Sequence, residues 1–132
     1  MQVDRRVFTQ LVLTTVGAAA VAVPVLAAQS KTVAVSMVNA PTAKFEPESV
    51  TIAAGDTVQW TNPEAVGHTV TCDPKEAVDK SLVVLPPGVP PFDSGDMVEG
   101  AVFKHTFTQK GTYKYICLYH ESMGMVGTVI VT

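Results

Sequence analysis

Apolar residues alternate with polar or small residues over several short stretches of the chain, and glycine, proline, asparagine and aspartate separate these stretches. The alternation occurs at residues 33–37, 50–52, 58–60, 68–72, 103–107, 113–117 and 129–131. A period of two residues is typical of strands that bury one face, and no heptad or sustained 3.6-residue period follows residue 27. The pattern therefore predicts an all-β domain.

The predicted strands are short and are joined by turns, which favours a two-sheet β-sandwich of about seven or eight strands. Trp60, Tyr113 and Tyr115 fall at inward positions of the pattern, so we expect them to pack in the core. Residues 73–100 are the exception, because they are rich in proline and lack a clear period. We expect this segment to cross the surface, with one short helix near residues 75–80.

The N-terminal segment has a different character from the rest of the chain. Arg5 and Arg6 precede an uncharged apolar run from Leu11 to Val23, and small residues follow around Ala27. This order is typical of an export signal, and the paired arginines resemble a twin-arginine signal. A retained membrane anchor is the alternative, although the apolar run is shorter than the about 20 residues of a spanning helix.

We therefore divide the chain into an export signal at residues 1–27 and one domain at residues 28–132, and we expect a periplasmic or otherwise extracytoplasmic protein. The formal net charge is −3, and both arginines of the chain lie in the predicted signal. An acidic domain without arginine is a poor ligand for phosphate backbones, so we expect no nucleic-acid partner. We expect membrane association only if the signal is retained.

Residues with soft donor atoms gather near the C-terminus. Cys117, His120, Met123 and Met125 lie within nine residues, where a predicted strand ends and a glycine-containing loop begins. A thiolate, an imidazole and a thioether together prefer copper over the hard cations, which prefer oxygen ligands. His68 begins another predicted strand and can supply a second imidazole. The sequence therefore predicts a copper site.

The stretch from Cys117 to Gly127, CLYHESMGMVG, resembles the copper loop of the plastocyanin and pseudoazurin family of cupredoxins. Residues 45–68 and 107–115 are similar to the same family, and the resemblance covers roughly residues 31–132. It implies a cupredoxin-like Greek-key β-sandwich that binds one type 1 (blue) copper ion.

The resemblance also implies the ligands. His68 and His120 would bind through a ring nitrogen, Cys117 as a thiolate, and Met125, five residues after the second histidine, as the axial ligand. Met123 is a rival to Met125 only through its proximity. With all four positions filled by the protein, no position stays open for a substrate, so we expect a protein that is not an enzyme.

A carrier of single electrons is the function that this resemblance implies. The protein would be a monomer that meets redox donor and acceptor proteins in transient complexes, through an apolar surface around His120. The candidates for this apolar rim are Met37, Pro41, Val66, Pro86, Pro87 and Leu118. Two alternatives stay open: a copper storage or delivery protein, and a metal-free sandwich stapled by a Cys72–Cys117 disulfide.

Three residues differ from the family pattern. Thr69 follows His68 where the family usually has asparagine, Tyr119 stands where proline is usual, and Ile116 stands where plastocyanins have tyrosine. The loss of the asparagine side chain is expected to loosen the connection between the two ligand-bearing loops.

Two further residues could be mistaken for ligands. His105 shares a predicted strand face with two phenylalanines, so we expect it to pack rather than to bind a metal. Cys72 is expected to be a free, buried thiol, because a bond to Cys117 would remove the thiolate from the copper site.

Overall fold

The structure is a computed structural model that describes residues 17–22 and 29–132. The predicted twin-arginine motif and the predicted cleavage region lie outside the described residues. Within the described part of the chain, no helix is both long enough and apolar enough to cross a membrane.

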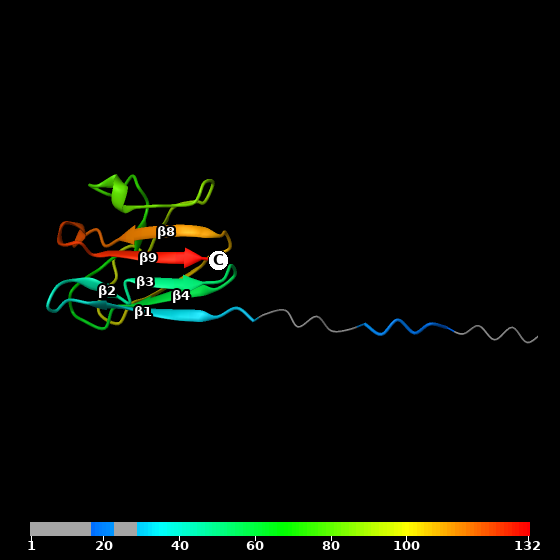
Figure 1. Cartoon of the computed structure of the whole chain (residues 1–132). Helices are drawn as coiled ribbons and strands as arrows, with labels where there is room; N and C mark the ends of the chain where they lie inside the picture. The colour runs from blue at the N-terminus through cyan, green and yellow to red at the C-terminus, as the bar shows by residue number, and fades with distance from the viewer. Residues whose placement is uncertain (1–16, 23–28) are drawn as a thin grey trace, which may run out of the picture.

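The domain is a sandwich of two β-sheets (Figure 1). The first sheet has the strand order β2-β1-β4-β7, and the second has the order β3-β9-β8-β5-β6. The strands are β1 (Thr32–Val38), β2 (Lys44–Glu46), β3 (Ser49–Ile52), β4 (Thr57–Thr61), β5 (Thr71–Cys72), β6 (Phe92–Asp93), β7 (Val102–Thr106), β8 (Gly111–Ile116) and β9 (Val126–Val131). The predicted all-β sandwich is confirmed.

The chain passes repeatedly from one sheet to the other. β1 and β2 belong to the first sheet, β3 to the second and β4 to the first again. β5 and β6 then belong to the second sheet, β7 to the first, and β8 and β9 to the second. As a result, β1 pairs with β4 and β3 pairs with β9 in parallel, while the other neighbours are antiparallel. This crossing brings segments far apart in the sequence to the same end of the sandwich.

The alternating residues of the strands fill one core between the sheets. Trp60 of β4 and Tyr115 of β8 are buried there, and the Trp60 indole N–H donates a hydrogen bond to the Tyr115 hydroxyl at 2.9 Å. The ring of Phe45 meets that of Tyr115 edge to face, with 4.7 Å between centroids. Tyr113 is also buried. The predicted packing roles of the three aromatic residues are confirmed.

The alternation of apolar and polar residues did not predict the short strands β2 and β6. β2 and β6 have three and two residues, too few for an alternation to be recognised. It also extended one strand too far, since only Thr71 and Cys72 of the predicted strand 68–72 belong to β5. His68 instead forms an isolated bridge with Met97.

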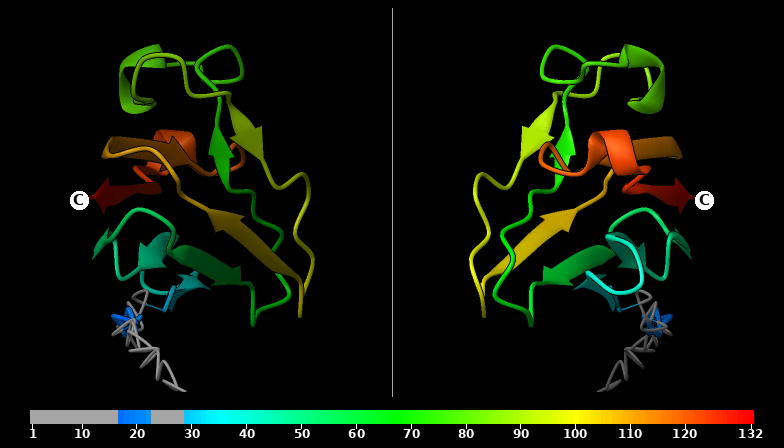
Figure 2. Two further views of the ribbon diagram at one scale, coloured as in Figure 1. Left: turned by 90° about the vertical axis from the view of Figure 1, so that its right-hand side faces the viewer. Right: turned by 90° about the vertical axis from the view of Figure 1, so that its left-hand side faces the viewer.

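The proline-rich segment, residues 73–100, crosses the surface between β5 and β7, as predicted. The expected helix at residues 75–80 is wrong, because the structure has only one 3-10 turn, η1 (Lys80–Leu82). Asp79 caps this turn through the Ser81 N–H at 3.0 Å, and the chain is extended again at Val83. The next residue, Val84, already pairs with Lys114 of β8, so no further helical turn can form. The η1 turn lies beside the loop that follows β8 (Figure 2).

Candidate metal centre

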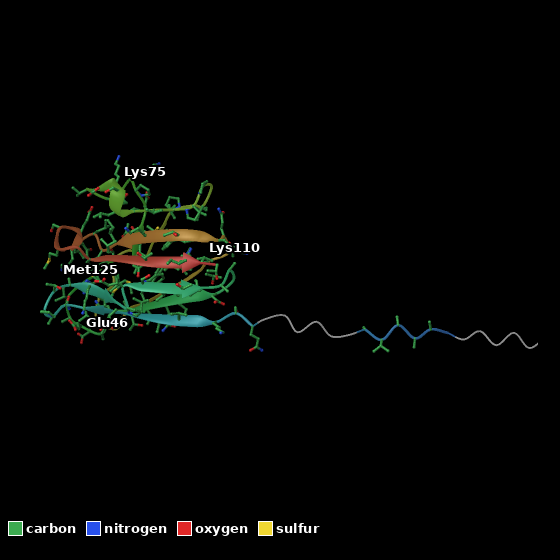
Figure 3. All side chains as sticks on the ribbon, viewed as in Figure 1. Glu46, Lys75, Lys110 and Met125 are labelled. Carbon is green, nitrogen blue, oxygen red and sulfur yellow. The ribbon has the colours of Figure 1, made fainter. Side chains whose placement is uncertain are left out.

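The loop between β8 and β9, residues 117–125, carries most of the predicted ligands. It lies at the end of the sandwich opposite to the start of β1, and Met125 is labelled there in Figure 3. The backbone closes the loop on itself, because Cys117 N–H donates to the Met125 carbonyl at 3.1 Å and Met125 N–H donates to the His120 carbonyl at 3.2 Å. A 3-10 turn, η2 (Glu121–Met123), follows His120. Residues at both ends of the loop are therefore held beside His120.

Three donor atoms from distant parts of the chain meet at this end. His68, Cys117 and His120 each offer one donor atom, and these atoms all lie within 4.8 Å of one another. The Cys117 Sγ atom is 3.7 Å from Nδ1 of His68 and 3.5 Å from Nδ1 of His120. Bonds of about 2.3 Å to sulfur and about 2.0 Å to nitrogen, arranged trigonally, put the sulfur about 3.7 Å from each nitrogen. The spacing therefore fits one metal ion between the three side chains.

The surroundings of the two imidazoles differ. His68 is fully buried, and its Nε2 atom has no hydrogen-bond partner among the described residues. Burial lowers the pKa of His68, and the charge of His120 lowers that pKa further. A neutral imidazole is the form that binds metals, so the environment favours binding at His68. His120 is only half-buried.

Met125 and Met123 lie in opposite environments. Met125 is completely buried directly before β9, with its backbone bonded to Cys117 and His120. Met123 is 58% exposed. Of the two methionines, only Met125 is buried and bonded through its backbone to two residues that carry donor atoms.

Comparisons with known proteins agree on one family. The model of the copper-binding plastocyanin/azurin family matches residues 31–132. This chain belongs to that family. The chloroplastic plastocyanin of Tetradesmus obliquus is 36% identical over 89 residues, which are 66% of this chain and 57% of that protein. The plastocyanin of Lactuca sativa is 32% identical over 92 residues, 66% of this chain and 86% of that protein.

Solved cupredoxin structures have the same fold. A pseudoazurin from Methylobacterium extorquens superposes with a TM-score of 0.60 at 27% identity, covering 76% of this chain and 74% of that chain. The purple cupredoxin from Nitrosopumilus maritimus superposes with a TM-score of 0.59 at 27% identity, covering 76% of this chain and 99% of that chain. The resemblance seen in the sequence is confirmed, and the donor set of the site is consistent with one type 1 copper ion.

Thr69 connects the two ligand-bearing loops of this cupredoxin. Its backbone N–H points to Cys117 Sγ at 3.4 Å, and its hydroxyl accepts a hydrogen bond from Leu118 N–H at 2.9 Å. The same hydroxyl lies 2.9 Å from that of Thr71, which in turn bonds to Asp93 at 3.1 Å. The threonine hydroxyl therefore joins the two loops at the position where the family usually has asparagine.

The two cysteines are both free and buried. Cys117 faces the two imidazoles, whereas the Cys72 thiol lies 3.3 Å from the Lys114 carbonyl and 3.7 Å from the Val84 carbonyl. Burial raises the pKa of Cys72 to about 12. The prediction of a free, buried Cys72 is confirmed, and the Cys72–Cys117 disulfide is contradicted.

His105 lies outside the group of donors. Its ring stacks on that of Phe92, with 3.9 Å between centroids, and meets Phe107 edge to face. Burial lowers its pKa. The predicted packing role of His105 is confirmed.

Part of the predicted apolar rim is wrong. Met37 is fully buried, because it is an inward residue of β1. Pro86 and Pro87 lie near the start of β8, where a Cβ at Gly111 would be 2.7 Å from the Pro86 ring and where the Gln109 side chain bonds to the Pro87 carbonyl. Figure 3 shows Lys110, directly before β8, at the end of the sandwich away from Met125.

The other rim candidates are accessible. Pro41 and Val66 are exposed, and Leu118 is half-buried. Sequence reasoning missed Tyr119, which is 55% exposed directly before His120. Its aromatic side chain directly before a predicted ligand was the available clue.

Proposed function

We propose that this cupredoxin is an exported, extracytoplasmic electron carrier with one type 1 copper ion. In this proposal His68, Cys117, His120 and Met125 would hold the ion through two imidazole nitrogens, a thiolate and a thioether. The supporting observation is the convergence of two imidazole nitrogens and one thiol sulfur, which all lie within 4.8 Å of one another.

Bound copper would supply a one-electron change between Cu(II) and Cu(I). The role of the protein is to hold the donors still, since a site that moves little on electron transfer has a low barrier. His68 is held by its bridge to Met97, and Cys117 by its N–H bond to Met125 and by the Thr69 N–H directed at its sulfur. The buried side chains around them exclude water.

His120 is the ligand through which we propose that electrons enter and leave, because it is less buried than His68 and Cys117. Val66, Tyr119 and Met123 are exposed apolar or aromatic residues of the two ligand-bearing segments. A small surface of this kind suits brief encounters of a monomer with its redox partner proteins. Four protein ligands leave no open position on the ion, so we propose no catalytic activity.

We also propose that residues 1–27 are a twin-arginine export signal and that residues 28–132 are the exported domain. The family match begins at residue 31, which agrees with this division. Mass spectrometry of the protein recovered from the periplasm of a bacterial host would give the cleavage site.

The test is the visible absorption and electron paramagnetic resonance of the copper-loaded domain, together with reversible reduction. We expect intense orange-red absorption that disappears on reduction and returns on oxidation. Cys117→Ala should abolish the colour, and Met125→Leu should shift or weaken it. An unchanged spectrum in Cys117→Ala, or rapid loss of copper to a weak chelator, would contradict a carrier, the latter favouring copper delivery.

A further inference from the structure

His120 lies on an exposed part of the ligand loop, and its backbone alone does not explain how its ring is positioned. The only hydrogen-bonding contact of the ring among the described residues is with the sulfur of Cys117. Both sequence neighbours of His120, Tyr119 and Glu121, direct their side chains away from the loop. Each of them bonds to the proline-rich segment, residues 73–100.

Tyr119 bonds to the far part of this segment. Its hydroxyl donates to the Asp96 carboxylate at 3.1 Å, and the next residue, Met97, exchanges two backbone hydrogen bonds with His68 at 2.8 and 3.2 Å. A Cβ at Gly67 would lie only 3.3 Å from the Asp96 carboxylate. The Tyr119 side chain therefore connects the loop of one imidazole to the backbone partner of the other.

Glu121 bonds to the near part of the same segment. Its two carboxylate oxygens accept the backbone N–H groups of Val78 at 3.1 Å and of Asp79 at 2.8 Å. Asp79 in turn holds the start of the η1 turn, because its carboxylate accepts hydrogen bonds from both the N–H and the hydroxyl of Ser81. These bonds agree with the η1 and η2 turns lying side by side (Figures 1 and 2).

The two segments also share a pocket. Its volume is about 340 Å³, and it is lined by Val78, Asp79 and Leu82 on one side and by Leu118, Glu121 and Ser122 on the other. The contact between the proline-rich segment and the ligand loop is therefore open to water rather than a packed core interface. Here the hydrogen bonds of the Glu121 carboxylate hold the two segments together.

We propose that the proline-rich segment is a clamp on the ligand loop, and that Tyr119 and Glu121 are positioning residues for His120. The inference rests on the proposed copper site. Tyr119 and Glu121 limit the displacement of the His120 backbone in two directions, and thereby slow the release of copper. They touch neither donor atoms nor metal, so their effect on the ion is indirect.

A clamp differs from a simple contribution to stability. The bonds of Tyr119 and Glu121 are exposed, and exposed hydrogen bonds contribute little to global unfolding. They fix a loop that has no core of its own, so their removal should change local opening much more than global stability. The two effects can be measured separately.

The experiment compares Tyr119→Phe, Glu121→Ala, Glu121→Gln and the Tyr119→Phe/Glu121→Ala double variant with the wild-type domain. Glu76→Ala is the matched control, because it removes an exposed carboxylate from the same segment, and that carboxylate makes no hydrogen bond within the described residues. With a strong chelator, we expect copper release to be about tenfold faster in Glu121→Ala and faster still in the double variant. Glu121→Gln keeps one acceptor oxygen, so its rate of copper release should lie between the rates of Glu121→Ala and the wild type.

Amide hydrogen exchange of the copper-free domain provides a second readout that does not need the metal. The amides of Val78 and Asp79 should exchange faster in Glu121→Ala, while that of Val129 in the buried strand β9 should not. If the wild-type domain does not form the blue copper site, the proposed function is wrong. Hydrogen exchange of the copper-free domain still shows whether Glu121 holds the proline-rich segment against the ligand loop. Unchanged exchange at Val78 and Asp79, or equal acceleration of copper release by Glu76→Ala, would overturn the clamp.

Discussion

The two halves of the metal centre are built in different ways. The inner half, formed by His68, Thr69 and Cys117, is buried, and its hydrogen bonds lie inside the sandwich. The outer half, residues 119–124, is mostly exposed, and its side-chain hydrogen bonds reach a surface segment. One half therefore depends on the packing of the core, and the other depends on contacts that water can compete with. Substitutions of similar size should have unequal effects in the two halves.

The largest difference is expected between the two cysteines. Burial raises the pKa of Cys72 to about 12, so very little of this thiol is ionised at pH 8 and its alkylation should be slow. Cys117 is covered by the loop of the outer half, which should open more readily than the core. Alkylation of the native copper-free domain, followed by peptide mass spectrometry, should label Cys117 first. Faster labelling of Cys72 would show that the core opens before the loop does.

A pair of glycines compares the core of the sandwich, on which the inner half depends, with the outer half. A Cβ at Gly127 would lie 2.7 Å from Cε1 of Tyr115, whose hydroxyl is fixed by Trp60. Gly127→Ala should therefore lower the free energy of unfolding by about 3 kcal/mol. Gly124 has a φ of 80° and open space around its Cα, so Gly124→Ala should lower it by only about 1 kcal/mol. Urea denaturation of the two copper-free variants measures both unfolding free energies. Equal losses would contradict the distinction between a packed core and an exposed outer half.

Thr69 tests the hydrogen bonds of the inner half. Thr69→Val keeps the shape of the side chain but leaves the Leu118 N–H and the Thr71 hydroxyl without this partner. We expect a loss of about 2 kcal/mol in unfolding free energy. Thr69→Ser is the control, since it keeps the hydroxyl and should lose less than half as much. If valine and serine give the same stability, the hydroxyl does not join the loops.

The smallest effect on unfolding is expected in the outer half. Tyr119→Phe removes one exposed hydrogen bond and should change the unfolding free energy by at most about 1 kcal/mol. Thermal denaturation of Tyr119→Phe and Thr69→Val under the same conditions shows which substitution lowers the stability more. A larger loss in Tyr119→Phe than in Thr69→Val would reverse the assignment of the two halves.

Much of the inner half could be predicted from the sequence. Alternation places Trp60 and Tyr115 in the core, and the spacing of Cys117, His120 and Met125 marks the ligand loop, because regular strands and a short loop leave few ways to arrange these residues. Met37 shows the limit of this reasoning: the same alternation that made it a strand residue also buried it, so it could not form the rim.

The contacts of the outer half could not be predicted, because they join two loop segments that show no regular alternation of apolar and polar residues. Nothing in the spacing of Glu121, Val78 and Asp79 indicates that a side chain in one loop accepts two amides of another. The hydrogen bonds of Thr69 could not be predicted for a related reason. The identity of the residue suggests a lost asparagine side chain, whereas only the structure shows that the Thr69 hydroxyl reaches Leu118.

The central claim is that one copper ion lies between two imidazoles and a thiolate. Copper-edge X-ray absorption of the domain loaded with one equivalent measures this most directly. We expect one short copper–sulfur distance and two copper–nitrogen distances, with the sulfur contribution absent in Cys117→Ala. A wild-type spectrum with only oxygen and nitrogen neighbours would contradict it.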